Sequence, residues 1–418
     1  MKTQALKGMR DLLPAEQALR DYIQGKILET YRASGFERIS TPMLEDMENL
    51  DKSDGGDNLN LIFKVLKRGD KLTSALGSGD PKQLSDMGLR YDLTLPLSRF
   101  YAANKDKLPH PFKVIQTDRV FRAERPQKGR LREFVQCDID ILGDESPNAE
   151  VELIDVTARA LLRIGFTGFT VNINDRRILR GMLESMGFAA DTLDSVCITF
   201  DKMDKIGLEG VAAELGEEGY AKESIDKYLE LFELLKDRKD VAEGVAFLKD
   251  KLGDFLDQEV ADSLTEIATA VNATKNAEFT LVFDPTLVRG MSYYTGTIFE
   301  IAMPELGAAC GGGGRYDKMI GKFTGNDVPA CGFSIGFERI ILLLMESGFK
   351  IPERPKRVAY LVEKKYPAEK LVDVMKQAKE ARENGQQVLV VRMNKNKKFQ
   401  KEQLSKEGYE EFEEFFNK

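Results

Sequence analysis

Apolar and polar residues alternate most clearly between Phe112 and Gly143. In the second half of this stretch, alternate positions from Val135 to Ile141 are apolar. The opposite face carries Arg132, Phe134, Gln136, Asp138 and Asp140. A period of two is typical of a strand with one side in the core. Because a similar run precedes the Arg- and Lys-rich loop, we predict two antiparallel strands joined as a hairpin.

The polar face of this hairpin is a candidate ligand site. It presents Arg122, Glu124, Gln136 and Asp140. The planar fork of arginine forms two parallel charge-assisted hydrogen bonds with a phosphate. The alternative is a solvated strand face with surface ion pairs, which is the usual explanation for charge on a strand. Related signals elsewhere in the chain favour a ligand.

Helical and strand patterns alternate along the rest of the chain. Apolar residues recur at helical spacing over 15–34 and 148–164, and 169–175 is predicted to be a strand. From 176 to about 276 the pattern is helical only, which indicates an inserted helical region. Strand patterns return over 277–303.

Shorter stretches give further predictions. We predict a helix over 61–69 and a loop over 71–83. From 355 onward the pattern indicates a strand, a helix and a second strand. The final charged run, 394–416, is predicted to be a helix with no further strand after it, so the last domain would be small.

Composition excludes several classes of chemistry. The chain has 418 residues, and no apolar run approaches the ~20 residues needed to cross a bilayer, so a cytoplasmic protein is expected. Its four cysteines form no CxxC pair, which argues against a zinc site or a disulfide framework. The single histidine, His110, makes a Ser-His-Asp triad improbable. A net charge of -8 argues against a generally basic surface, although a local positive groove can still bind RNA.

Two further motifs suggest a ligand. Four consecutive glycines, Gly311 to Gly314, cost backbone entropy, so we expect a ligand or a neighbouring chain to approach closely there. They fit neither a P-loop nor a dinucleotide-binding frame. In LRYDLT, Asp92 and Thr94 either hold an ammonium group or cap a helix, and the residues alone leave both readings open.

Together these motifs resemble class II aminoacyl-tRNA synthetases and, within them, the histidyl-tRNA synthetase family. The three class motifs match GFERISTPMLE, FRAERPQKGRLREFVQCDIDILG and ACGFSIGFERI. The family-specific matches are KGMRDLLP, LRYDLT, VRGMSYYTGTIFE and GGGGRYD. They follow in order from Lys7 to about Arg392.

The resemblance implies an α+β fold: an antiparallel six-stranded class II catalytic sheet flanked by helices, with a helical insertion and a small C-terminal α/β domain. The catalytic domain would comprise 1–175 and 277–350, and the insertion 176–276. A partial anticodon-binding domain would occupy 355–418. The resemblance also implies a homodimer built around the first motif, with no membrane association.

The implied reaction is the activation of histidine by ATP to histidyl-adenylate, followed by transfer to tRNA(His). Mg2+ would be carried by ATP, without a metal cage built by the protein. The implied catalytic residues are Arg289 and Arg122, and the ATP-binding residues are Arg122, Glu124 and Arg339. The implied histidine-binding residues are Asp92, Thr94, Gln136, Asp140, Arg289, Tyr293 and Tyr294. The tRNA acceptor end would meet Arg125, Gln127, Lys128 and Arg130.

One residue departs from the family pattern, and two rival functions stay open. Ser292 stands where the family has an acidic residue in RGxDYY. One rival is the synthetase-like regulatory subunit of ATP phosphoribosyltransferase, which binds ligands without charging tRNA. The other is a class II-like protein that activates another amino acid or none. The LRYDLT and RGMSYYT motifs favour histidine.

Overall fold

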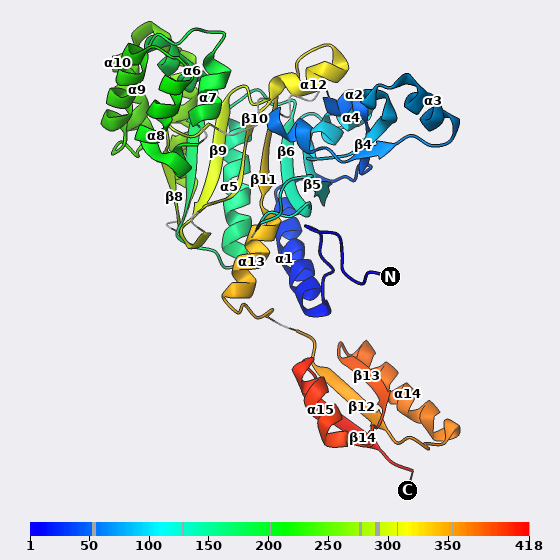
Figure 1. Cartoon of the computed structure of the whole chain (residues 1–418). Coiled ribbons are helices and arrows are strands. Elements are labelled where there is room, and N and C mark those ends of the chain that lie inside the picture. Colours follow the sequence, from blue (N-terminus) through cyan, green and yellow to red (C-terminus); the bar gives the residue numbers. More distant parts are fainter. Residues whose placement is uncertain are drawn as a thin grey trace. The chain divides into compact units, whose positions relative to one another are not determined.

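The computed structural model describes residues 1–51, 56–127, 129–200, 202–275, 278–288, 293–306, 308–352 and 354–417 (Figure 1). Its contacts divide the chain into a large unit, Met1–Gly348, and a small unit, Phe349–Lys418. Over the described ranges, no helix has the length and apolar character needed to span a membrane.

The large unit is built on one eight-stranded sheet. Its strands, in spatial order, are β1 (Glu37–Arg38), β5 (Phe112–Phe121), β6 (Glu133–Leu142), β11 (Ala330–Ile335), β10 (Ala308–Arg315), β9 (Thr297–Met303), β7 (Phe169–Asp175) and β8 (Phe279–Phe283). The six strands from β5 to β7 are antiparallel, as the family resemblance implied. The edge strands β1 and β8 are added in parallel, which makes the sheet mixed. The predicted hairpin is β5 and β6.

One face of this sheet is apolar and covered by helices. Cys137, Ile139 and Ile141 of β6 are buried on it. The covering helices are α1 (Pro14–Ala33), α5 (Asn148–Arg163) and α13 (Phe337–Glu346). Figure 1 shows α5 lying along the strands. Because alternate strand residues point to opposite faces, the polar residues of β6 point away from these helices.

The opposite face is polar across the central strands. The strand register aligns Gln116, Asp138, Ser334, Gly312 and Glu300 in one row. One end of this face is covered by α4 (Thr94–Asn104) and α12 (Asp317–Thr324), which pack through Leu97, Tyr101, Met319 and Ile320. The polar face therefore has a covered end and an end that these helices leave clear.

A small antiparallel sheet lies beside these elements and corrects two predictions. It consists of β2 (Leu44–Asp46), β4 (Ser85–Leu89) and β3 (Lys64–Leu66), next to α2 (Met47–Asp51) and α3 (Asp70–Ser78). The helix predicted over 61–69 is wrong, because pairing with β4 draws this segment into a strand. The loop predicted over 71–83 is also wrong, since α3 forms there and ends at Gly79 with a φ of 70°.

The described residues between 176 and 275 form helices and turns without strands, as the pattern predicted. The helices are α6 (Arg176–Ser185), α7 (Leu193–Phe200), α8 (Met203–Glu217), α9 (Lys222–Leu235), α10 (Val241–Leu252) and α11 (Gln258–Thr274). They share a core in which the rings of Phe200 and Tyr228 stack with centroids 4.4 Å apart.

The small unit is a parallel sheet of β13 (Gln387–Arg392), β12 (Arg357–Val362) and β14 (Glu411–Phe415). Its helices are α14 (Ala368–Glu383) and α15 (Lys397–Lys406). The prediction of one terminal helix without a further strand is wrong. Gly408, with a φ of 91°, follows α15, and Phe412 and Phe415 then pack beside β12, so this burial directs the last residues into β14.

Candidate functional site

The candidate site has a floor made by the polar faces of β6, β11 and β10. Gly332 pairs with Asp140 of β6 and with Gly314 of β10. A Cβ at Gly332 would lie 2.0 Å from Asp140 Oδ1, so glycine is required beside this carboxylate. On the apolar face, the rings of Phe299 and Phe333 stack with centroids 4.7 Å apart in the row of Gly313. The glycines thus allow close packing between strands.

Asp140 lies at the covered end of the floor among tyrosines. The Tyr316 hydroxyl donates a hydrogen bond to Asp140 Oδ1 at 2.6 Å. Burial raises the pKa of Asp140 to about 7, although the Tyr316 hydrogen bond acts in the opposite direction. The ring of Tyr293 is 6.0 Å from that of Tyr316 and 4.8 Å from that of Tyr294. The structure therefore brings Asp140 together with both predicted tyrosines.

Asp92 and Thr94 lie at the start of α4. Asp92 Oδ1 accepts a hydrogen bond from the backbone N–H of Leu95 at 3.2 Å, so the capping interpretation describes this oxygen. Asp92 Oδ2 is buried without a hydrogen-bond partner. Burial raises the pKa of Asp92 to about 6. The side chain of Thr94 is hydrogen-bonded to Tyr293, which links this segment to the tyrosines.

A buried arginine that the sequence analysis missed holds this segment in place. Arg90 is fully buried, and it donates to the carbonyl oxygens of Thr41 and Arg119 at 2.8 Å each. It also forms an ion pair with Asp118 at 2.9 Å. Its position two residues before Asp92 in LRYDLT was the available signal.

Gln136 and Asp138 occupy the middle of the floor. Gln136 Nε2 lies 3.3 Å from Ser334 Oγ and 3.5 Å from Asp138 Oδ2. Asp138 is buried, and both this burial and the neighbouring Asp140 raise its pKa. The alternating pattern of β6 placed Asp138 on this face, but no role was predicted for it. Its alternation with Gln136 and Asp140 was the signal for one.

Arg122 and Glu124 follow the end of β5. Arg122 Nε donates to the carbonyl oxygen of Tyr91 at 3.0 Å, and its guanidinium lies 5.2 Å from the centre of the Phe134 ring. The charge of Arg122 favours the ionised forms of Asp92 and Asp138 and opposes the effect of burial on their pKa values. Glu124 is partly buried.

Arg339 lies beside the opposite end of the floor from Asp140. It is in the first turn of α13 and donates to the carbonyl oxygen of Ala309. The preceding Gly336 donates its N–H to the Cys310 carbonyl at 2.7 Å, which joins the end of β11 to β10. Since Gly336 continues β11 beyond Ile335, which pairs with Cys137, Arg339 is level with the Gln136 end of β6.

The predicted tRNA loop makes a tight turn. Gln127 and Arg130 exchange two backbone hydrogen bonds of 3.1 and 2.9 Å around Gly129, which has a φ of 73°. Arg125 and Arg130 are exposed. Arg130 forms a 3.6 Å ion pair with Glu124. Lys128, Arg289 and Ser292 lie outside the described residues.

Comparison with known proteins decides the family. The histidyl-tRNA synthetase family model matches residues 8–340. This chain belongs to the histidyl-tRNA synthetase family. A histidine--tRNA ligase of Leifsonia xyli is 44% identical over 97% of this chain and 94% of its own length. A probable histidine--tRNA ligase of Tropheryma whipplei is 40% identical over 90% of this chain and 87% of its own length.

Solved structures have the same fold. A histidyl-tRNA synthetase from a Nostoc species aligns with a TM-score of 0.78 and 25% identity, covering 98% of this chain and 90% of that one. A Bacillus halodurans protein described as an ATP phosphoribosyltransferase regulatory subunit/histidyl-tRNA synthetase aligns with a TM-score of 0.79 and 21% identity, covering 100% of this chain and 99% of that one. Both cover the small unit as well as the catalytic sheet.

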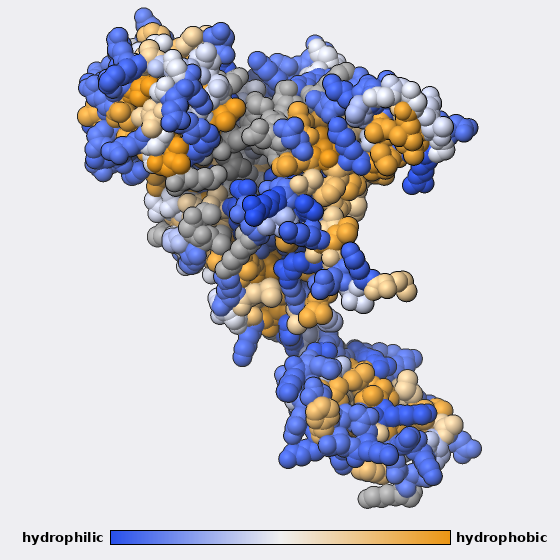
Figure 2. Space-filling model, in the orientation of Figure 1, coloured by the Kyte–Doolittle hydropathy of each residue, from blue (hydrophilic) through white to orange (hydrophobic). Residues whose placement is uncertain are grey.

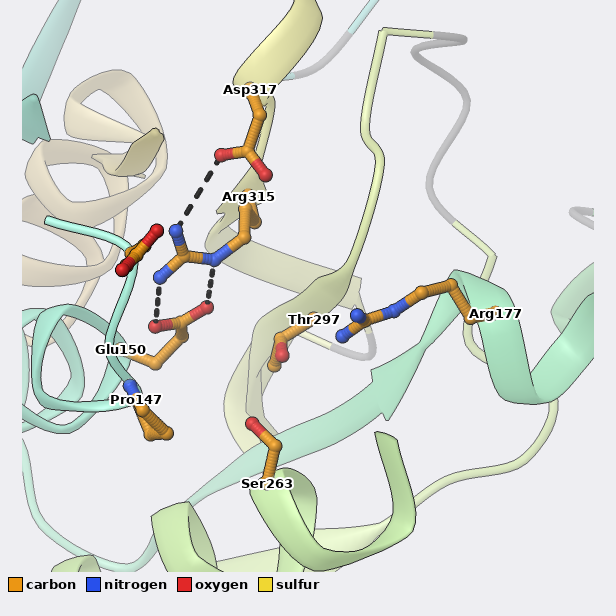
Figure 3. Close-up of a pocket in the computed structure, with 8 residues that line it drawn as sticks. Pro147, Glu150, Arg177, Ser263, Thr297, Arg315 and Asp317 are labelled. Atoms are coloured by element: carbon orange, nitrogen blue, oxygen red, sulfur yellow. Dashed lines mark hydrogen bonds and ion pairs between the residues drawn. The ribbon is translucent and has the colours of Figure 1, made fainter. Parts of the chain in front are cut away.

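A separate polar cavity of about 150 Å³ lies where the sheet meets the helical region (Figure 3). It is lined by Glu145, Pro147, Glu150, Arg177, Ser263, Thr297, Arg315 and Asp317. Arg315 donates to both carboxylate oxygens of Glu150 at 2.7 Å, and Arg177 donates to Asp175 at 2.8 and 3.0 Å. Because both guanidinium groups are already paired, we assign the cavity a structural role.

Proposed function

We propose that this chain activates histidine with ATP and transfers it to tRNA(His). The observation that carries the proposal is the polar floor, which places Asp140 and the tyrosines at one end and Arg122 and Arg339 towards the other. An amino acid and a nucleotide can therefore meet over the middle of one sheet face.

The covered end suits the side chain of histidine. Asp140 can accept a hydrogen bond from an imidazole N–H, and Tyr293 and Tyr294 supply aromatic surface beside it. Asp92 and Gln136 would lie nearer the reacting centre, and their unpaired oxygens, Asp92 Oδ2 and Gln136 Oε1, could accept hydrogen bonds from the α-amino group. Thr94 would support this group through its bond to Tyr293.

The activation step needs positioned charge and no protein nucleophile. A histidine carboxylate oxygen bonds to the α-phosphorus of ATP, the bond to the bridging oxygen of the β-phosphate breaks, and diphosphate leaves. Arg122 would hold the α-phosphate and carboxylate, and Arg339 the γ-phosphate. Glu124 would accept a hydrogen bond from the adenine amino group, and Arg289 would stabilise the α-phosphate. ATP would carry Mg2+, which neutralises phosphate charge.

In the second step, a terminal ribose hydroxyl of tRNA attacks the acyl carbon and releases AMP. The exposed turn bearing Arg125, Gln127, Lys128 and Arg130 would meet the phosphates of the acceptor end. We place the reaction in the cytoplasm, where the four free cysteines would stay reduced.

The protein would act as a homodimer. The outer face of the β2–β4–β3 sheet exposes Leu44, Leu66 and Met87, at 44%, 55% and 38% of their surfaces. Apolar patches extend over this region in Figure 2. Such patches mark association surfaces in many proteins. This sheet directly follows the first motif, which the family resemblance places at the dimer interface.

A regulatory subunit of ATP phosphoribosyltransferase is the second candidate, since the Bacillus halodurans structure carries that description beside histidyl-tRNA synthetase. Exchange of labelled diphosphate into ATP separates the two functions. We expect exchange that depends on histidine, followed by charging of tRNA(His). Histidine binding without exchange would favour the regulatory subunit, and exchange driven by another amino acid would refute the proposed substrate.

A further inference from the structure

Three buried acceptor oxygens in the candidate site have no hydrogen-bond donor within the described structure. They are Asp92 Oδ2, Gln136 Oε1 and Asp138 Oδ1. Buried acceptors are normally paired, because removing them from water without a partner is unfavourable. Three of them in one site indicate a ligand that supplies donors.

The three oxygens belong to neighbouring groups. Gln136 and Asp138 are alternate residues on the polar face of β6, and Gln136 Nε2 lies 3.5 Å from Asp138 Oδ2. Because the Gln136 nitrogen faces a carboxylate and the Ser334 hydroxyl, its Oε1 is the oxygen left to accept. Gln116, which pairs with Asp138 across β5 and β6, donates to the carbonyl oxygen of Leu93 at 2.9 Å. Asp138 therefore lies beside the segment that carries Asp92, and the charge of Asp92 helps to raise the pKa of Asp138.

The chemistry of this group defines its ligand. Two carboxylates and an amide oxygen match a cation with three N–H donors, and a primary ammonium group has this number. An imidazole would leave one acceptor unpaired, and its expected position is beside Asp140. Resting on the proposed function, we infer that Asp138 binds the α-ammonium group of histidine directly, together with Asp92 and Gln136.

This assignment changes the role of Thr94. The family resemblance grouped Thr94 with Asp92 and Gln136 at the amino group. Its side chain is also hydrogen-bonded to Tyr293, so in this assignment Thr94 positions the tyrosine proposed to lie beside the imidazole. Asp138 supplies the third acceptor in its place, and it adds a second negative charge opposite the ammonium.

The test compares histidine with 3-(imidazol-4-yl)propionate, which lacks only the amino group. Binding of both to the full chain is measured by calorimetry, for the wild type and for Asp138→Asn. Losing one charge-assisted hydrogen bond should weaken histidine binding roughly ten- to hundredfold. Binding of the des-amino ligand should not weaken, so the preference for histidine shrinks. A general disturbance of the fold would weaken both ligands alike.

Two control variants bracket this result. Asp140→Asn alters the imidazole end and should weaken both ligands by a similar factor. Asp155→Asn removes a carboxylate of α5 that pairs with Arg159 away from the floor and should change neither. If Asp138→Asn does not fold, Asp138→Ser keeps a small polar group there and is subject to the same comparison.

Equal weakening of both ligands by Asp138→Asn, or no weakening of histidine, overturns the inference. Its failure is distinguishable from failure of the proposed function. A wild-type protein that neither binds histidine nor exchanges diphosphate refutes the function itself. A wild type that prefers histidine, with an unchanged preference in the variant, refutes only the assignment of Asp138.

Discussion

Arg20 and Glu338 form a two-pronged ion pair that ties α1 to α13. The two guanidinium nitrogens of Arg20 lie 2.7 and 2.6 Å from the two carboxylate oxygens of Glu338, and the side chains are only 7% and 13% exposed. Glu338 also accepts the backbone N–H of Val135 at 3.1 Å. Glu338 precedes Arg339 and Val135 precedes Gln136, so this contact holds the first turn of α13 against the Gln136 end of β6.

Replacing Arg20 by Met should leave the Glu338 carboxylate buried without its partner. Removing one member of a buried pair typically lowers the free energy of unfolding by about 3–5 kcal/mol. We also expect the replacement to raise the KM for ATP more than the KM for histidine, since α13 carries Arg339. Urea unfolding and diphosphate-exchange kinetics measure the two effects. Arg159→Met, which breaks the more exposed pair with Asp155, should cost below about 1 kcal/mol. Equal costs would contradict this prediction.

Replacing Gly332 by Ala should displace Asp140, because the added Cβ would lie 2.0 Å from its Oδ1. The hydrogen bond from Tyr316 would break, and histidine affinity should fall roughly tenfold or more. Calorimetric titration with histidine measures the loss. Gly25→Ala on α1 is the matched control, since the added Cβ would meet no side chain and no backbone outside its own helix turn within 4 Å. Unchanged histidine affinity in Gly332→Ala would show that the carboxylate position is not critical.

The stability of the ligand-free protein should depend on Asp140 between about pH 4 and about pH 7. Burial raises the pKa of this carboxyl to about 7, whereas in the unfolded chain it is about 3.9. The folded state therefore binds the proton more tightly, and the free energy of unfolding falls as the pH rises through this window. Above about pH 7 the contribution is constant.

Asp140→Asn should flatten this dependence, which melting temperatures of both proteins across the window would reveal. Some slope should remain, because burial also raises the pKa values of Asp92 and Asp138. Parallel curves for the wild type and the variant would contradict the assignment of the raised pKa to Asp140.

Replacing Arg289 by Ala should remove transition-state stabilisation and leave histidine binding largely intact. Loss of one preorganised donor typically costs ~3 to 4 kcal/mol in the activation step. Diphosphate exchange should collapse while calorimetry still detects histidine. Arg238→Ala, which breaks an ion pair with Glu243 in the helical region, serves as the control. Unchanged exchange in Arg289→Ala would refute its catalytic role.

Replacing Leu66 by Glu should weaken the proposed dimer, because it buries a charge in an apolar interface. Sedimentation at micromolar concentration should show a shift towards monomer. Leu371→Glu is the matched control, since Leu371 is also exposed but lies on α14 in the small unit. A wild type that sediments as a monomer, or a variant that stays dimeric, would exclude this interface.

The local sequence pattern predicted those elements in which the alternation of apolar and polar residues shows which face is buried. The hairpin of β5 and β6 was predictable because Cys137, Ile139 and Ile141 alternate with polar residues. The segments that became β3 and β14 were not, because each depends on a neighbouring strand for its hydrogen bonds. The sequence also identified the family, since its motifs occur in the order of the family.

The sequence by itself determined which side chains share the polar face, because strand residues alternate with a period of two. The tertiary structure alone decided how each is used. Asp140 is paired because the hydroxyl of Tyr316, the residue after β10, donates a hydrogen bond to it. One oxygen of Asp92 accepts a hydrogen bond from a backbone N–H in the first turn of α4. Whether an oxygen is left unpaired depends on the donors that the folded chain brings beside it, and Tyr316 lies 176 residues from Asp140 in the sequence.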